Sequence, residues 1–221
     1  MTRASEPGLD AFLCHRVEAS AQQLATSVPA PEIVQSPRDA AAVVLIVRSP
    51  HGQVVTYAPI ALSTEDGRLS RMEMLPEDPE DLQLLAIRQS EKLLGAGALF
   101  RARDGSTVLV SGLVQESVLA EDACVTSVTE NYVRAMLDLP LGAPVMRGAA
   151  AALGFVRWAP DLHGALRHCM ARDPLARIHL YGTEGVRGMT IGHVCVVADD
   201  RDDAARRARH AADYLTGTIE E

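Results

Sequence analysis

The stretch from Asp122 to Gly142 constrains the fold most, because it predicts a helix with a marked start and a fixed end. Apolar residues recur there every three or four positions, on one helix face: Val125, Val128, Tyr132, Met136 and Leu139. Ser127 followed by Glu130 has the spacing of a capping box, and Asp122 is a second candidate N-cap. Pro140 lacks a backbone donor and Gly142 tolerates positive φ, so the helix must end near them. We expect a core helix with no chemistry of its own.

The same stretch, DACVTSVTENYVRAMLDLPLG, resembles a segment of the 5-(carboxyamino)imidazole ribonucleotide synthetases, the ATPase subunit of phosphoribosylaminoimidazole carboxylase. Three further segments follow the order of that ATP-grasp family: VVLIVRSPHGQVVTY at 43–57, HLYG at 179–182 and GMTIGHVCVV at 188–197. The resemblance covers residues 39–215 and implies an α+β fold. It implies the C-terminal half of an ATP-grasp lobe, an antiparallel sheet with helices, followed by a small β-rich C-terminal domain. The family's N-terminal nucleotide-binding domain has no counterpart here.

Three parts are expected along the chain. Residues 1–39 form a helical leader, with a helix from Pro7 to Val28, and a proline-rich linker. Residues 40–142 form the ATP-grasp-like lobe, and residues 143–221 form the small β-rich domain with a closing helix. Expected strands are 40–47, 53–60, 69–75, 98–103, 107–113, 147–156, 177–181 and 189–197. Expected helices are 79–94, ended by the glycines at 95 and 97, then 161–172 and 200–215.

Composition excludes several classes of partner. The net charge is −8 and the basic residues do not cluster, which argues against nucleic acid. No apolar run reaches the roughly 18 residues of a spanning helix, so no membrane partner is expected. The four cysteines form no C-x-x-C pair, which favours free thiols in a reducing compartment over disulfides. We expect a cytoplasmic protein.

Motifs for chemistry are scarce. There is no P-loop, no G-x-G-x-x-G and no G-x-S-x-G. His163, His168 and Cys169 are compatible with a metal site or with a helix surface beside a buried thiol. Glu116 and its acidic neighbours at 121 and 122 are compatible with acid–base work or with a solvated loop before a helix. We therefore assign no cofactor and no metal.

The resemblance implies that ATP chemistry has been lost. In the family, a glutamate on one hairpin strand and an Asn-Glu pair on the next hold magnesium on the ATP phosphates. Ala98 stands in place of the first, and Val110-Ser111 or Ser111-Gly112 in place of the second. A divalent hard cation binds through anionic oxygens, which these residues do not supply. The family's phosphate-binding cations fall near Thr183 and Val186, where Arg187 is the remaining cation.

Charged positions of the family have thus become mostly apolar, which leaves two alternatives. Either the old cleft has collapsed and filled with side chains, or it is lined anew for an apolar ligand. The second alternative predicts a pocket with Glu116 and His193 as polar groups and candidate catalytic residues, and with these walls: Tyr57, Ala98, Val110, Ser111, Leu113, Val114, Tyr181, Arg187, Met189 and Ile191.

Two functions from different classes follow, with a third behind them. The first is an ATP-independent, repurposed protein that binds an apolar small molecule, as a cofactor-free cyclase or isomerase of specialised metabolism. The alternative is a non-catalytic scaffold or partner subunit derived from the purine-pathway synthetase. The third is an active synthetase. We expect a homodimer in each case, because the missing N-terminal domain leaves part of the lobe uncovered.

Overall fold

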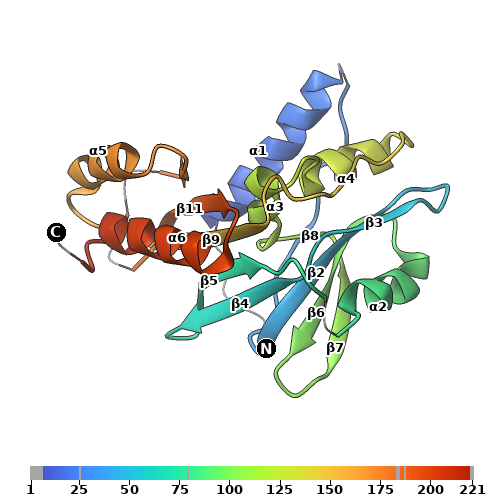
Figure 1. Ribbon diagram of the computed structural model, residues 1–221. Helices are drawn as coiled ribbons and strands as arrows, with labels where there is room; N and C mark the ends of the chain where they lie inside the picture. Colours follow the sequence, from blue (N-terminus) through green and yellow to red (C-terminus); the bar gives the residue numbers. More distant parts are fainter. Residues whose placement is uncertain (1–6, 25, 79, 183–184, 187, 220–221) are drawn as a thin grey trace.

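The computed structural model describes residues 7–24, 26–78, 80–182, 185–186 and 188–219. Its centre is an antiparallel nine-stranded sheet in the order β10-β11-β9-β5-β4-β2-β6-β7, with β3 paired to β2 (Figure 1). The strands are β1 (Ile33–Val34), β2 (Ala40–Arg48), β3 (Val54–Thr56), β4 (Ile60–Glu65), β5 (Arg68–Met74), β6 (Gly95–Ala102), β7 (Thr107–Ser111), β8 (Leu113–Val114), β9 (Ala150–Arg157), β10 (Arg177–Leu180) and β11 (Thr190–Ala198). The helices are α1 (Pro7–Gln23), α2 (Leu82–Gln89), η1 (Ser90–Lys92), α3 (Ser117–Ala123), α4 (Val128–Met136), α5 (Leu162–Arg172) and α6 (Arg201–Thr216). β1 and β8 form a separate parallel pair.

Helices cover both faces of the sheet, which explains the continuous apolar runs of its strands. In β2, Val43 and Leu45 point into the main core under α1, α3 and α4, whereas Val44 and Ile46 point to α2. In β9, Leu153 joins the main core, while its neighbours at 152 and 156 pack under α5 and α6. Strand alternation therefore sorts the side chains into three apolar clusters around one sheet.

The mixed fold with an antiparallel sheet is confirmed, but a separate small C-terminal domain is not. β9 pairs with β5 in an antiparallel ladder that includes Met72 opposite Leu153. The C-terminal strands therefore continue the sheet of the preceding lobe. The expected boundaries at 39 and 142 stay a prediction.

Of the two candidate caps for the helix predicted within residues 122–142, Ser127 is the one used, and the helix is shorter than the apolar pattern from Val125 to Leu139 indicated. The chain forms α3 and α4, and the residues between them pair with 143–146, as in the Cys124–Met146 bridge. Val125 consequently lies outside any helix and is 52% exposed. The Ser127 cap is confirmed, because its Oγ accepts a hydrogen bond from the backbone N–H of Glu130 at 3.2 Å. Asp122 is not a cap but part of α3.

Other element ends differ in ways that matter for packing. Residues 95–97 begin β6 instead of ending the preceding helix. A Cβ on Gly95, whose φ is +82°, would lie 2.9 Å from the Met136 side chain, so its small size lets α4 approach the sheet. The strand expected at 53–60 is divided into β3 and β4, and α1 ends at Gln23 rather than Val28.

Candidate functional site

Four residues of the predicted apolar wall lie in the main core. Tyr57 and Ala98 have no exposed surface, and Leu113 and Val114 are also buried. Ala98 lies in β6, opposite Leu45 of β2, and its side of the strand faces the core under α3 and α4. These side chains therefore pack against protein.

The other predicted wall residues lie elsewhere. Val110 and Tyr181 are partly buried against the main core, whereas Ser111 is exposed and Met189 is 41% exposed. Ile191 belongs to the cluster under α5 and α6, because a register shift between residues 190 and 192 interrupts the alternation of β11. Arg187 lies outside the described residues. The structure does not bring this set together as one wall.

Both polar candidates are fully buried. Glu116 accepts a hydrogen bond from the Ser36 hydroxyl, with Oγ and Oε2 2.6 Å apart. His193 lies in β11, and its Nδ1 is 2.5 Å from the Tyr181 hydroxyl. Glu116 therefore connects the linker to the start of α3 by a hydrogen bond. His193 belongs to a separate polar group, which also includes Asp122, Arg177, His179 and Tyr181.

Two members of this polar group, Arg177 and His179, lie in β10. Alternation along this edge strand places Arg177, His179 and the following Tyr181 on the same face. The register pairs His179 with His193 of β11, and the two imidazole centroids are 4.8 Å apart. Phe12 of α1 packs against the rings of 179, 181 and 193, with centroid distances of 5.2 to 5.7 Å. The leader helix thus covers a polar face of the sheet.

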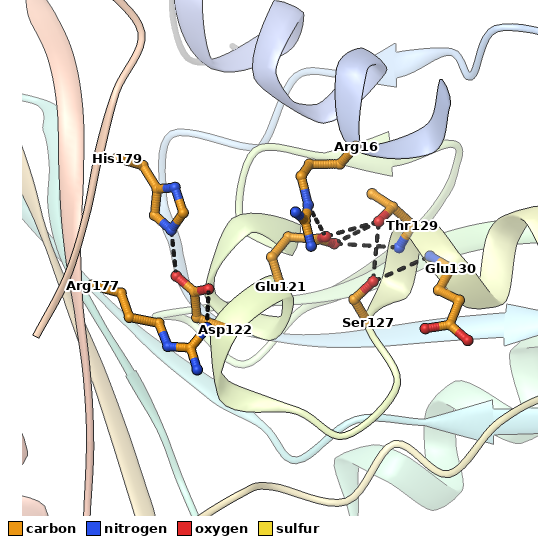
Figure 2. A network of polar contacts seen from close by, with 8 residues as sticks. All are labelled: Arg16, Glu121, Asp122, Ser127, Thr129, Glu130, Arg177 and His179. Carbon is orange, nitrogen blue, oxygen red and sulfur yellow. Dashed lines mark hydrogen bonds and ion pairs between the residues drawn. The ribbon is translucent and has the colours of Figure 1, made fainter. Parts of the chain in front are cut away.

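Asp122 of α3 supplies the carboxylate of this group (Figure 2). Its Oδ2 lies 2.7 Å from Nε2 of His179, and its Oδ1 accepts from Arg177 at 3.3 Å. Burial favours the neutral acid, but the hydrogen bond and charge of His179 and the charge of Arg177 outweigh it and lower the pKa of Asp122. Asp122 is therefore a paired carboxylate at neutral pH.

His193 has the opposite electrostatic environment. Complete burial, assisted by the neighbouring His179, lowers the pKa of His193 to about 3. Its Nε2 is buried and has no hydrogen-bond partner in the described part of the chain. The imidazole is therefore neutral at ordinary pH, and one of its nitrogens is unused.

A second network branches from the adjacent residue of α3. Glu121 points away from Asp122 and towards α1, where Arg16 Nε donates to its Oε2 at 3.0 Å (Figure 2). The Thr129 hydroxyl at the start of α4 lies 2.8 and 2.9 Å from the two carboxylate oxygens. Burial raises the pKa of Glu121 despite the lowering effect of Arg16 and Thr129. These contacts fasten the leader helix beside the polar group.

The donor set of the polar group fits a metal ion, which the sequence did not indicate. One ligand atom each from Asp122, His179 and His193 lies within 4.8 Å of the others. The earlier metal candidates, His163, His168 and Cys169, are on α5, where Cys169 is a buried thiol that donates to the Ala211 carbonyl.

The chain is similar in sequence to known proteins. No family model matches the chain. The N5-carboxyaminoimidazole ribonucleotide synthase of Mycobacterium bovis is 31% identical over 190 residues, covering 78% of this chain and 44% of that protein. The enzyme of the same name from Corynebacterium ammoniagenes is 28% identical over 194 residues, covering 78% and 46%. The chain is a relative of these synthases. It spans less than half the length of these curated relatives.

Solved structures of the synthase family have the same fold. The phosphoribosylaminoimidazole carboxylase ATPase subunit of Aquifex aeolicus superimposes with a TM-score of 0.66 at 20% identity, covering 79% of this chain and 56% of that chain. The synthetase of Thermus thermophilus gives a TM-score of 0.62 at 23% identity, covering 84% and 52%. The resemblance inferred from four sequence segments is thereby confirmed. The described residues of this synthase relative contain no helix with the length and apolarity needed to cross a membrane.

The sequence contained a partial signal for the polar group. His179 and His193 both lie in segments that resemble the synthase family, HLYG and GMTIGHVCVV. The sequence indicated Asp122 only as a second candidate cap and as one of three acidic neighbours, so it was not linked to the histidines. Arg177 precedes the matching segment and was not singled out. Their association depends on how α3 docks on β10, which no local pattern states.

Proposed function

We propose that this synthase relative is an ATP-independent, non-catalytic protein that works as a scaffold or partner subunit. The observation that carries the proposal is the position of Ala98. It stands where the resemblance requires a magnesium-binding glutamate, and it is fully buried in the main core, opposite Leu45 of β2. Binding Mg-ATP at this point would need both an oxygen ligand and open space, and a packed alanine offers neither.

An exposed apolar face offers a surface for the partner. α2 buries Leu82 and Ala86 against the sheet, while Leu84 and Ile87, three positions apart, remain 45% and 41% exposed. Leu94, which lies between η1 and β6, is 55% exposed. Apolar residues gathered in this way mark interaction surfaces more often than isolated ones do. We assign this face to a symmetric homodimer, since a two-fold interface needs only one self-complementary patch.

The test combines light scattering with calorimetry. The wild-type chain should have about twice the monomer mass of 23.7 kDa at micromolar concentration. Ile87→Glu should give a monomer, because a charge would be buried in the interface. Leu24→Glu is the matched control, since Leu24 is 45% exposed but lies after α1. Titration with Mg-ATP should give no heat.

Two results would overturn the proposal. A monomer mass for the wild-type chain at every concentration would contradict the proposed homodimer. A dissociation constant for Mg-ATP below about 100 μM, roughly 5.5 kcal/mol of binding, would restore a nucleotide site.

The polar group favours a second candidate, a small-molecule enzyme without ATP. The side chains of His179 and Arg177 are 29% and 58% exposed, so a ligand can reach them. Such a ligand would be polar, unlike the apolar one expected from the sequence, because this place offers charged and hydrogen-bonding groups. This candidate requires His179→Gln to abolish turnover of a substrate.

A further inference from the structure

Two imidazoles and one carboxylate converge beneath α1 from three separate segments. Asp122 comes from α3, His179 from the edge strand β10 and His193 from the neighbouring strand β11. One ligand atom of each lies within 4.8 Å of the other two. The sheet register places the histidines directly opposite each other, so their approach is fixed by backbone pairing.

His193 provides an independent indication of a ligand. Its side chain is fully buried, and Nε2 has no hydrogen-bond partner in the described part of the chain. Buried polar atoms are nearly always paired, so an unused buried nitrogen calls for an explanation. The Tyr181 hydroxyl lies 2.5 Å from Nδ1 of the same ring. When that hydroxyl accepts from Nδ1–H, Nε2 presents a lone pair, which is how a second group orients a metal-binding histidine.

The carboxylate has a similar outer partner. Arg177 donates to Oδ1 of Asp122, which leaves Oδ2 to face His179 at 2.7 Å. An ion that replaced the shared proton would retain the carboxylate's orientation, because the arginine still holds Oδ1. Each of these two ligands is thus oriented by a residue that would not itself touch the ion.

We propose that Asp122, His179 and His193 bind a divalent transition-metal ion, with Zn²⁺ the best fit. Bonds of about 2.1 Å in a tetrahedral site put ligand atoms about 3.4 Å apart. The His179–Asp122 pair, now 2.7 Å apart, must open by about 0.7 Å, and a pair as wide as 4.8 Å must close by about 1.4 Å. The proposal therefore requires side-chain rotations that make both movements.

The ligand types favour some metal ions over others. Imidazole nitrogen suits zinc, copper and nickel, whereas magnesium and calcium prefer all-oxygen sites. Three protein ligands leave a fourth position for water, on the side where His179 is partly exposed. This site is separate from the magnesium positions of the resemblance, and it does not depend on the proposed partner function.

The experiment measures binding directly on the full-length chain. After treatment with a chelator, the protein is titrated with Zn²⁺ and separately with Mg²⁺ by calorimetry. One equivalent of Zn²⁺ should bind with a micromolar or lower dissociation constant, and Mg²⁺ should not bind. His179→Gln removes a direct ligand and should weaken Zn²⁺ binding by at least about 100-fold, the upper range for losing an outer partner of a metal ligand. His51→Gln is the matched control, because His51 forms a similar 2.6 Å pair with Asp138 on the surface.

Co²⁺ provides a test that needs no variant. Tetrahedral Co²⁺ with nitrogen and oxygen ligands absorbs visible light strongly, and Zn²⁺ should displace it in one step. Absence of Zn²⁺ binding to the wild-type chain would overturn the proposal. So would binding that both His179→Gln and Asp122→Asn retain at wild-type affinity, since the ion would then lie elsewhere. Loss of binding in His51→Gln alone would assign the ion to the surface pair instead.

Discussion

Two regions under the same layer of helices have opposite chemistry. At β6, Ala98 and the neighbouring strand residues fill the core with apolar side chains. At β10 and β11, His179 and His193 present nitrogens to Asp122 beneath α1. Both regions belong to a sheet whose fold is that of the synthases. The difference teaches that one sheet can hold small apolar side chains packed against protein at one place and a buried polar group, joined by hydrogen bonds, at another.

The largest expected effect comes from Ala98→Glu. A glutamate there would add volume to a packed core and bury a charge without a partner. Overpacking costs about 1–3 kcal/mol and an uncompensated buried charge about 3–5 kcal/mol, so the variant should lose most of its stability. Urea denaturation followed by circular dichroism measures this loss. Val108→Glu, on the adjacent strand and 46% exposed, should stay within about 1 kcal/mol of wild type.

The opposite outcome would break the comparison. If Ala98→Glu folds with wild-type stability, water reaches that position and the region near β6 is an open cleft. The apolar pocket predicted from the sequence would then regain its support.

A smaller effect is expected for Arg16→Ala, which removes the cation from Glu121. Leaving a buried carboxylate without its partner should cost about 3 kcal/mol at pH 8, the low end of the range because Arg16 is 41% exposed. The cost should shrink at pH 5. Burial raises the folded-state pKa of Glu121, so the native state binds more protons, and stability falls as pH rises from the unfolded to the folded pKa. Losing Arg16 raises the folded pKa further and widens that window.

Denaturation at pH 5 and pH 8 checks both the size and the sign. Arg134→Ala is the control, because Arg134 pairs with Glu130 four residues earlier on a partly exposed helix surface. That pair should contribute about 0.3–0.5 kcal/mol with little pH dependence. Equal destabilisation of Arg16→Ala at both pH values would show that Glu121 is not the group responsible.

Local sequence patterns predicted the layers of this fold well. A strand was expected at 40–47, and β2 is a strand there, with side chains buried on both faces. The Ser127–Glu130 spacing identified the start of α4. The closing helix appeared within one residue of its expected bounds, with Asp200 as its cap. Each of these features depends on neighbours within one turn or one strand.

The missed features depend on contacts between distant residues. The break between α3 and α4 forms because the backbone near Cys124 pairs with residues 143–146. Because of that break, Asp122 lies within α3 and pairs with Arg177 and His179 of β10 instead of capping a helix. The bulge near Ile191 moves that residue to the other side of the sheet. The separate C-terminal domain expected from the sequence is not confirmed, because β5 and β9 pair across about eighty residues of sequence.

The smallest effect is expected for Phe12→Ala. It tests whether α1 protects only the polar region, and not the core near β6, from local opening. The ring lies edge-on to His179 and His193, with centroids 5.2 and 5.5 Å away, and it is only partly buried. Its loss should cost about 1–2 kcal/mol, since aromatic pairs contribute about 0.5–1.5 kcal/mol beyond the energy of the area they bury.

The more informative readout is native-state hydrogen exchange. Amides of β10 and β11 should exchange faster, because this edge loses its cover, while amides of β2 and β6 keep their protection. Leu24→Ala, after the end of α1, should change neither set. Faster exchange in both regions would mean that they open together, and the polar region would then be an inseparable part of the core.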